Sequence, residues 1–201
     1  MLFRSDDYMR LDHRKICSII PPRAKILDLG CGNGDLLELL TINKQIEGSG
    51  IEISPVKMQE AIAKGMSVIQ GDLEDTIKDY RNKQFDYCIL SQTLQDLKDP
   101  ERTLKEMLRV GNKVIIAFYN LAYWRYRIHI MFKGTFPKSK ELPYEWLTTN
   151  ILFLSVKDFE AFCDKHQIQI VQNLYFVHEK QIHFWPNVRS TLCIFEIAHN
   201  K

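Results

Sequence analysis

The chain has 201 residues, with 27 Lys and Arg against 25 Asp and Glu and a formal net charge of +2. This length suits one domain with a single hydrophobic core, and the balanced charge argues against a nucleic-acid ligand. No apolar run approaches the roughly 20 residues of a membrane-spanning helix, and the N-terminus lacks the apolar region of a signal peptide. We therefore expect a single domain over residues 1–201, located in the cytoplasm and not at a membrane.

Five cysteines are scattered along the chain, at Cys17, Cys31, Cys88, Cys163 and Cys193. Their number is odd, they are far apart, and most lie inside apolar runs. This pattern fits neither a disulfide framework nor a CxxC metal site. We expect reduced core residues and no bound metal.

The first half of the chain alternates apolar runs with helical spacing. Residues 7–20, ended by Pro21-Pro22, predict a lead-in helix that packs on the sheet and covers the ligand. Apolar runs typical of buried strands lie at 24–29, 48–53, 66–70, 85–90 and 113–118. Helices are expected at 34–43, 56–64, 74–82 and 100–109, with N-caps from Ser54-Pro55 and Asp99-Pro100. Such alternation predicts parallel strands with right-handed crossovers, covered on both faces.

The C-terminal quarter of the chain returns to regular structure after an interruption. Ser155 and Asp158 form a capping-box pattern for a helix over 156–166. Two further strands are expected at 168–177 and 191–198, antiparallel because a loop and not a helix joins them. The prediction is a doubly wound, mostly parallel α/β sheet of seven strands with an antiparallel C-terminal strand.

A glycine turn, Asp28-Leu29-Gly30-Cys31-Gly32-Asn33-Gly34, joins the first predicted strand to the helix that follows it. Backbone N–H groups converge on a ligand in such a turn, and the missing Cβ atoms let that ligand approach the main chain. The spacing is GxGxG, whereas the dinucleotide fingerprint GxGxxG places its last glycine one residue later. Because many α/β proteins bind some phosphate at such a turn, the flanking residues must decide the ligand.

Three carboxylates stand where the first three predicted strands end. Asp28 precedes the first glycine, and Glu52 ends the second strand, where a carboxylate can accept both ribose hydroxyls of an adenosine. Asp72 follows the third strand and offers an acceptor to the adenine amino group. Anionic groups beside the turn suit a ligand without phosphates. Each also has a simpler interpretation, with Asp72 as a turn residue and Glu52 as a solvated strand end.

Together these features resemble the class I methyltransferases that bind S-adenosyl-L-methionine (SAM), which have a Rossmann-like sheet. The resemblance implies that the three glycines line the methionyl part and that Asp28 helps to hold its ammonium group. It implies that Glu52 takes the ribose, Asp72 with Leu73 the adenine, and that Ser91 faces the methionyl side. The expected site for SAM or S-adenosylhomocysteine comprises Asp28, Gly30, Cys31, Gly32, Gly34, Glu52, Ile53, Asp72, Leu73 and Ser91.

Further segments are specific to a narrower group, above all Ser91-Gln92-Thr93-Leu94-Gln95 and Pro143-Tyr144-Glu145-Trp146. With Val68 to Leu73 and Leu104 to Gly111, they resemble the MetW family of bacterial methionine-biosynthesis proteins. The resemblance implies a protein that acts with, or regulates, the homoserine O-acyltransferase of that pathway. The family usually has Asn-Ile-His after the Pro-Tyr-Glu-Trp segment. Leu152 stands in place of that histidine, so no role for it carries over.

Residues 120–150 form an insert rich in aromatic and basic side chains, and three interpretations stay open. The insert is a substrate lid in which Arg125 and Arg127 clamp a carboxylate or phosphate. Alternatively, it is an exposed patch for a protein partner, because Trp, Tyr and Arg are frequent interface anchors. In the third, Trp124 and its neighbours pack on the sheet and the arginines are solvated. The candidate substrate or partner surface comprises Tyr119, Trp124, Arg125, Tyr144 and Trp146.

No catalytic residue is identified by a diagnostic spacing. The fourth strand leads into Leu90-Ser91-Gln92-Thr93 and not into the Asn/Asp-Pro-Pro-aromatic loop with which amino methyltransferases grip a planar nitrogen. His129, Tyr119, Tyr123 and Tyr144 are acid–base candidates without a distinctive arrangement, and a lone histidine such as His129 also fits a structural role. Two functions stay open: a SAM-binding partner or regulator of the acyltransferase, or a methyltransferase for an unidentified small-molecule acceptor.

Overall fold

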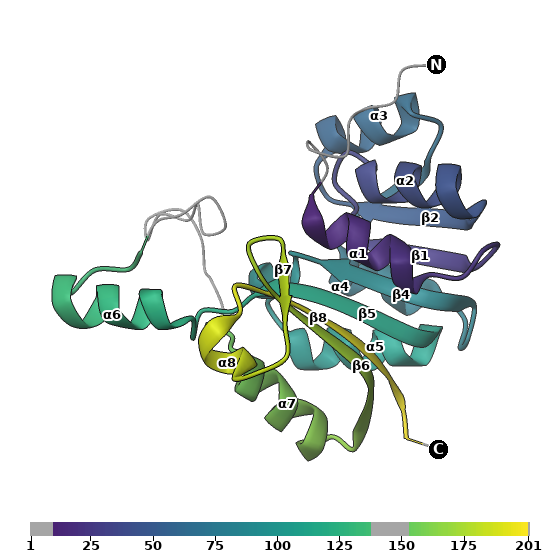
Figure 1. The fold of residues 1–201 in the computed structure, drawn as a ribbon. Coiled ribbons are helices and arrows are strands. Elements are labelled where there is room, and N and C mark those ends of the chain that lie inside the picture. Colours follow the sequence, from purple (N-terminus) through teal and green to yellow (C-terminus); the bar gives the residue numbers. More distant parts are fainter. Residues whose placement is uncertain (1–9, 138–152, 201) are drawn as a thin grey trace.

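The computed structural model describes residues 10–137 and 153–200, within which eight strands form one sheet (Figure 1). The strand order is β3-β2-β1-β4-β5-β8-β6-β7. Five parallel strands come first in the chain: β1 (Lys25–Leu29), β2 (Glu47–Glu52), β3 (Ser67–Gln70), β4 (Phe85–Ser91) and β5 (Gly111–Tyr119). They are followed by β6 (Ile168–Val177), β7 (Lys180–Ile182) and β8 (Leu192–His199). The mostly parallel α/β fold predicted from the sequence is confirmed.

Helices cover both faces of this sheet (Figure 1). One face packs against α1 (Leu11–Ile19) and α2 (Asp35–Lys44), and α3 (Pro55–Ala63) lies beside them. The other face packs against α5 (Pro100–Val110) and α7 (Val156–Lys165). The remaining helices are short or peripheral: α4 (Leu73–Thr76), α6 (Trp124–Lys133) and α8 (Pro186–Arg189).

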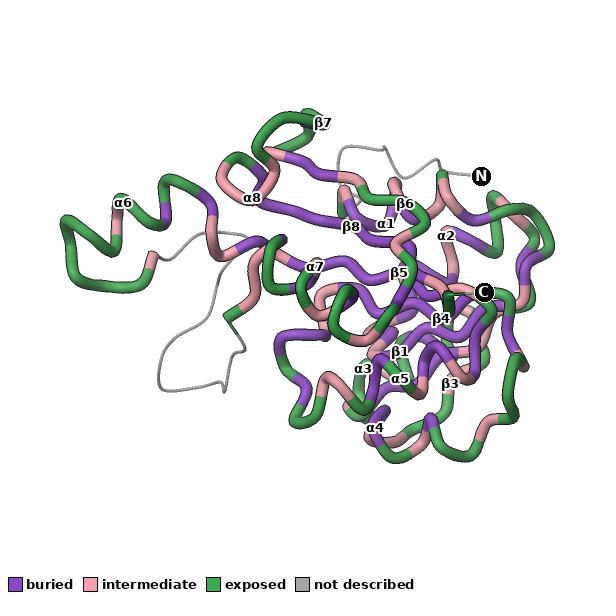
Figure 2. The backbone as a smooth tube through the Cα atoms, turned by 90° about the horizontal axis from the view of Figure 1, so that it is seen from below, coloured by how far each residue is buried: buried purple, intermediate pink, exposed green. Residues whose placement is uncertain are grey.

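The alternating side chains of the central strands build two cores. Ile115 points into the core beneath α1 and α2, whereas its neighbour Ile116 points into the core beneath α5 and α7. This follows from the period of two along a strand. Figure 2 shows that the central strands are buried and that most of α6 is exposed. No described helix is long and apolar enough to cross a membrane.

The predicted helix boundaries rest on capping that the structure confirms. The Ser54 hydroxyl accepts a hydrogen bond from the Lys57 N–H at 3.4 Å, and Pro55 is the first residue of α3. Asp99 caps α5 in the same way by accepting from the Arg102 N–H at 3.0 Å. Ser155 starts α7 with a complete capping box. Side-chain oxygens at these positions satisfy N–H groups that lack a partner within the helix.

The prediction of seven strands was wrong by one. β7 pairs antiparallel with β6 through a tight turn at His178 and Glu179, so that Tyr175 lies opposite Ile182. The strand has only three residues, and its turn lacks the Asn-Gly signal of a two-residue hairpin. The other late strands are as expected, because β8 runs antiparallel to both β5 and β6. The helix predicted at 74–82 is shorter, with α4 continuing only as a 3-10 turn over Ile77–Asp79.

Candidate functional site

A cavity of about 850 Å³ lies at the carboxyl ends of β1, β2 and β4. The strand order reverses between β1 and β4, which makes this position the topological switch point of the sheet. Open α/β sheets bind their ligands at such points, outside the carboxyl ends of the strands. The cavity is lined by nine of the ten residues expected to hold a cofactor: Asp28, Gly30, Cys31, Gly32, Glu52, Ile53, Asp72, Leu73 and Ser91.

The glycine turn forms one wall of the cavity. The backbone N–H groups of Gly30 and Cys31 donate to the Ile51 carbonyl at 2.9 and 3.1 Å, which fastens the turn to β2. Gly32 has a φ of +58° and no atom within 4 Å of the position that a Cβ would take. This glycine therefore leaves its backbone open to a ligand in a conformation that other residues adopt at a steric penalty.

Gly34, the tenth residue, does not line the cavity. It is the N-cap of α2 with a φ of +78°, and a Cβ there would lie 2.9 Å from the Cβ of Ala61 on α3. The expectation that Gly34 lines the methionyl part stays a prediction. Its place in the fold is the close packing of α2 against α3.

Glu52 is buried and holds the glycine turn in place. One carboxylate oxygen accepts from the Gly32 N–H at 2.9 Å, and the other accepts from the Ser54 N–H at 2.8 Å. The interpretation of Glu52 as a solvated strand end is thus wrong. Each carboxylate oxygen has two lone pairs, so each can still accept a hydroxyl group. The fixed orientation suits a pair of neighbouring ligand hydroxyls.

Asp28 is a buried carboxyl to which no group within the described residues donates a hydrogen bond. Burial raises the pKa of Asp28 to about 7, with the nearby Asp12 and Glu52 carboxylates adding to this effect and the Arg10 guanidinium opposing it. A buried polar group without a partner is unfavourable, and a perturbed carboxyl in a cavity indicates a functional site. A cationic group of a ligand, such as an ammonium group, would give the Asp28 carboxylate its missing partner.

Helix α1 and its N-cap residue Arg10 form another wall of the cavity. Arg10 donates to the Asp12 carboxylate at 3.2 and 2.5 Å, and the Ser91 hydroxyl donates to Asp12 at 2.6 Å. Burial would raise the pKa of Asp12, but Arg10, His13 and Ser91 together lower it. Burial and Arg10 lower the pKa of His13 to about 4, against the opposing effect of Asp12 and Asp35, so His13 is neutral at pH 7.

Arg10 and His13 line the cavity, and the sequence analysis missed both as site residues. The signal that could have found them is the placement of polar side chains among the apolar residues of the lead-in helix. That helix does lie over the cavity, as expected from residues 7–20.

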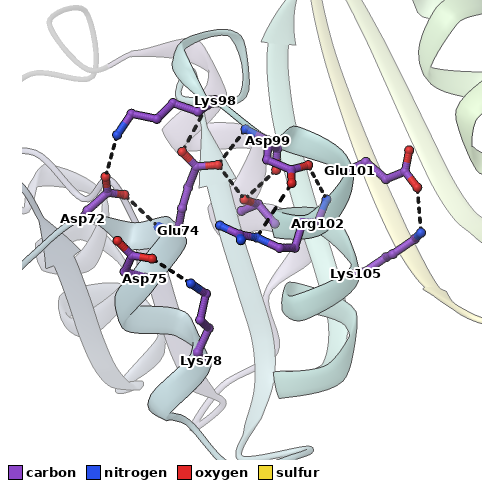
Figure 3. A network of polar contacts seen from close by, with 10 residues as sticks. Asp72, Glu74, Asp75, Lys78, Lys98, Asp99, Glu101, Arg102 and Lys105 are labelled. Atoms are coloured by element: carbon purple, nitrogen blue, oxygen red, sulfur yellow. Dashed lines mark hydrogen bonds and ion pairs between the residues drawn. The ribbon is translucent and has the colours of Figure 1, made fainter.

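The opposite end of the cavity is formed by Asp72 and its neighbours (Figure 3). Asp72 caps α4 by accepting from the Glu74 N–H at 3.0 Å, and its second oxygen lies 3.2 Å from the Lys98 ammonium. Asp72 is thus a helix cap as well as a cavity residue. Its predicted contact with an adenine amino group stays a prediction.

Glu74 fastens this wall, and the sequence analysis did not single it out. Its buried carboxylate accepts from the backbone N–H groups of Lys98 and Asp99 at 3.1 and 2.8 Å (Figure 3). The Thr103 hydroxyl is 3.3 Å from the same carboxylate. These bonds tie α4 to the first turn of α5 and so hold the Asp72 side of the cavity.

The described residues of the insert lie away from this cavity. Tyr119, Trp124, Arg125 and Arg127 are absent from its lining, and the interpretation of the insert as a substrate lid stays a prediction. Trp124 is 45% exposed, and the Arg125 guanidinium lies 5.9 Å from its ring centre. Its neighbours Tyr123 and Tyr126 are buried against residues that include Tyr119 and Val177 of the sheet, so the third interpretation describes these neighbours better than Trp124 itself. Tyr144, Trp146 and Leu152 lie outside the described residues.

The fold is that of the class I SAM-dependent methyltransferases. A Thermotoga maritima SAM-dependent methyltransferase, a possible histamine N-methyltransferase, is similar with a TM-score of 0.68 and 19% identity over 94% of this chain and 88% of that one. An Archaeoglobus fulgidus SAM-dependent methyltransferase is similar with a TM-score of 0.67 and 14% identity, over 92% and 90%. The [4+2]-cyclase SpnF has a TM-score of 0.67 and 13% identity, over 98% and 85%. The fold therefore does not fix the chemistry.

The chain belongs to the family described as methionine biosynthesis protein MetW, which it matches over residues 10–197. The bifunctional methionine biosynthesis protein MetXA/MetW of Rhodopirellula baltica is 32% identical over 182 residues, 86% of this chain and 29% of that protein. Norajmaline N-methyltransferase of Rauvolfia serpentina is 29% identical over 103 residues, 47% of this chain and 35% of that enzyme. The chain thus spans about a third of the length of these curated relatives.

Proposed function

We propose that this protein binds SAM and acts with, or regulates, a homoserine O-acyltransferase in methionine biosynthesis. The observation that carries the SAM proposal is the pair of buried carboxylates beside the glycine turn. Glu52 is held by two backbone N–H groups, whereas Asp28 has no hydrogen-bond donor within the described residues. An adenosyl ligand with an amino-acid tail would supply ribose hydroxyls to Glu52 and an ammonium group to Asp28.

The rest of the lining suits the same ligand. Gly30 and Gly32 would let the methionyl part approach the backbone, and Asp72 with Leu73 would face the adenine. Arg10, on the α1 side, offers a guanidinium to the tail carboxylate. When bound, SAM would supply an electrophilic methyl group. The protein's own contribution is to bind and orient that ligand and to cover it with α1.

The charge of the cavity disfavours the competing class of ligand. Three basic side chains line it, those of Arg10, Lys57 and Lys98, against seven carboxyl groups, those of Asp28, Asp35, Glu52, Glu60, Asp72, Glu74 and Asp96. A pyrophosphate placed among carboxylates is repelled, and the repulsion grows as water is excluded. This supports SAM over a phosphate-bearing dinucleotide such as NAD.

The partner half of the proposal is supported by the relative from Rhodopirellula baltica. That bifunctional methionine biosynthesis protein joins MetXA with MetW in its name, and this chain matches 29% of its length. Two activities on one polypeptide are held at a high effective concentration. We infer that the separate chain associates with the separate acyltransferase.

Calorimetry tests the ligand. SAM is titrated into the wild-type protein, Glu52→Gln and the control Glu47→Gln, which changes an exposed residue at the other end of β2. Loss of charged hydrogen bonds to the ribose should weaken binding by about 1.5–3 kcal/mol, or roughly 10- to 150-fold. The control should bind like the wild type. No binding to the wild-type protein, or equal affinity for the two variants, would contradict the proposal.

A rate measurement tests the partner role. The homoserine O-acyltransferase encoded by the same genome is assayed with and without this chain, at several SAM concentrations. We expect the acylation rate to depend on the presence of the chain. An unchanged rate together with no complex on a sizing column would refute the partner role, while the calorimetry would still decide SAM binding.

A second function is favoured by the local similarity to two Rauvolfia serpentina N-methyltransferases, over 47% and 43% of this chain. It is methyl transfer to a small-molecule acceptor, for which positioning of the nucleophile is the main requirement. Incubation with SAM and a metabolite extract distinguishes methyl transfer from SAM binding without turnover. Sustained, acceptor-dependent formation of S-adenosylhomocysteine would establish turnover. If none forms, methyl transfer is refuted and only the SAM-binding role remains.

A further inference from the structure

Helix α6 presents an apolar face to solvent. The helix projects from the body of the protein (Figure 1). Trp124, Ile128, Met131 and Phe132 recur at i, i+4, i+7 and i+8, a spacing that places them on one face. Their exposed fractions are 45%, 43%, 70% and 75%. We call these four residues the α6 face.

The opposite side of α6 attaches it to the protein. Tyr126 is buried, and its ring packs edge-on against Tyr123 with the ring centres 5.2 Å apart. Tyr119, Leu121 and Val177 pack against this pair. The helix is thus anchored through its first turns, and no element within the described residues covers the α6 face.

Four large apolar side chains on one exposed face indicate an interaction surface. Single exposed apolar residues are common, but contiguous patches usually mark a binding site. Apolar anchors at i, i+4 and i+7 are also the pattern with which a helix docks into a groove of another protein.

The charges on α6 indicate what kind of surface it meets. The helix carries Arg125, Arg127 and Lys133 and no acidic residue. At about 100° per residue, Arg125 and Arg127 lie on either side of the α6 face. Such a face is complementary to an apolar groove that carboxylates border.

A second exposed aromatic pair lies near the base of α6. Phe184 and Trp185 stack with ring centres 5.3 Å apart, and both are exposed. They directly precede α8, and α8 is tied to the start of the insert, because Asn120 donates to the Asn187 and Ser190 carbonyls at 3.0 Å.

We propose that the α6 face docks into an apolar groove, bordered by carboxylates, on the homoserine O-acyltransferase. This inference rests on the proposed function and names the surface that would carry the partnership. A second copy of this chain is disfavoured as the occupant, because a symmetric α6 contact would bring together basic helices without an acidic residue. A membrane surface is the other occupant that a basic amphipathic helix can have, and the vesicle experiment below tests it.

The test compares two substitution sets in the full chain. The double variant Met131→Ser and Phe132→Ser removes the two most exposed members of the α6 face. The control Ile42→Ser changes a residue on α2 that is 73% exposed. Affinity for the acyltransferase is measured by calorimetry, and SAM binding by each variant shows that its fold is intact. We expect the double variant to bind the acyltransferase at least roughly tenfold more weakly, and Ile42→Ser to bind within about twofold of the wild type.

Arg125→Glu tests the charge argument. It should weaken the complex, and added salt should weaken the wild-type complex more than that of Arg125→Glu. A complex that all variants form equally well would overturn this inference alone. No complex with the wild-type chain, despite SAM binding, would overturn both this inference and the proposed partner.

Two further results would reassign the surface. One is a dimer of the chain alone that the double variant dissociates. The other is co-sedimentation of the wild-type chain with phosphatidylglycerol vesicles that the double variant abolishes. Either would overturn the acyltransferase as the occupant of the α6 face.

Discussion

Asp28→Asn should make the protein more stable at alkaline pH while it removes the proposed contact with the ligand ammonium. Burial raises the pKa of the Asp28 carboxyl from its ordinary 3.8 to about 7. The folded protein therefore keeps a proton that the unfolded chain releases between these two values. The stability linked to that proton is fully present below about pH 4 and is lost as the pH rises through about 7.

The size of the effect follows from the pKa difference. At about 1.4 kcal/mol per pKa unit, the buried charge lowers the stability of the wild-type protein by roughly 4 kcal/mol at pH 8. At pH 5 the loss is roughly 1.5–2 kcal/mol, because most folded molecules still carry the proton. Asparagine does not titrate. Its stabilising effect relative to aspartate should therefore increase by about 2–3 kcal/mol from pH 5 to pH 8.

Urea unfolding of both proteins at the two pH values measures this increase. Titrating groups that do not interact with Asp28 are shared by the two proteins and cancel in the difference. The exposed Asp79 supplies the control, because Asp79→Asn should shift stability equally at both pH values. A stability difference for Asp28→Asn that does not change with pH would refute the buried, unpartnered state of this carboxyl. In SAM calorimetry the same variant should bind more weakly, so greater stability would accompany weaker binding.

Further predictions concern the cavity wall and the thiols. Glu74→Ala leaves the backbone N–H groups of Lys98 and Asp99 without their acceptor and should destabilise the protein by about 2–4 kcal/mol in urea unfolding. Asp75→Ala, which removes an exposed pair with Lys78, should change stability by less than about 1 kcal/mol. Equal effects of the two would contradict the role given to Glu74. Burial raises the pKa of Cys31 to about 12, so a disulfide reagent at pH 8 should modify Cys31 more slowly than the half-buried Cys17. Rapid labelling of Cys31 in the native protein would contradict its buried position.

The sequence was sufficient to predict features that depend on local order along the chain. A strand, a glycine turn and a helix follow each other directly, so the turn and its φ > 0 glycines could be located from spacing alone. Asp28, Glu52 and Asp72 each stand where a parallel strand ends. Because the carboxyl ends of parallel strands meet at one edge of the sheet, these carboxylates share one cavity.

Features that depend on packing between distant segments could not be predicted. Gly34 is required to be small by Ala61, which lies on another helix. Arg10 and His13 reach the cavity only because α1 folds back over the sheet. Glu74 meets its partners from the start of α5 only in the folded protein. In each case the spacing in sequence carries no information about the contact.

In the insert, the sequence predicted the composition of the surface but not which side chains face solvent. Its richness in Trp, Tyr and Arg was visible in the sequence, but the direction of each side chain was not. Tyr126 turns toward the body, whereas Met131 and Phe132 face solvent. The division into an anchored side and an exposed face appears only once the helix bounds are known.

A crystal structure of the full chain grown with S-adenosylhomocysteine tests the central claim most directly. We predict that the ligand occupies the cavity beside the glycine turn, with its ribose hydroxyls on the Glu52 carboxylate and its ammonium group on Asp28. An empty cavity at a saturating ligand concentration, or a ligand whose ribose lies away from Glu52, would contradict the account.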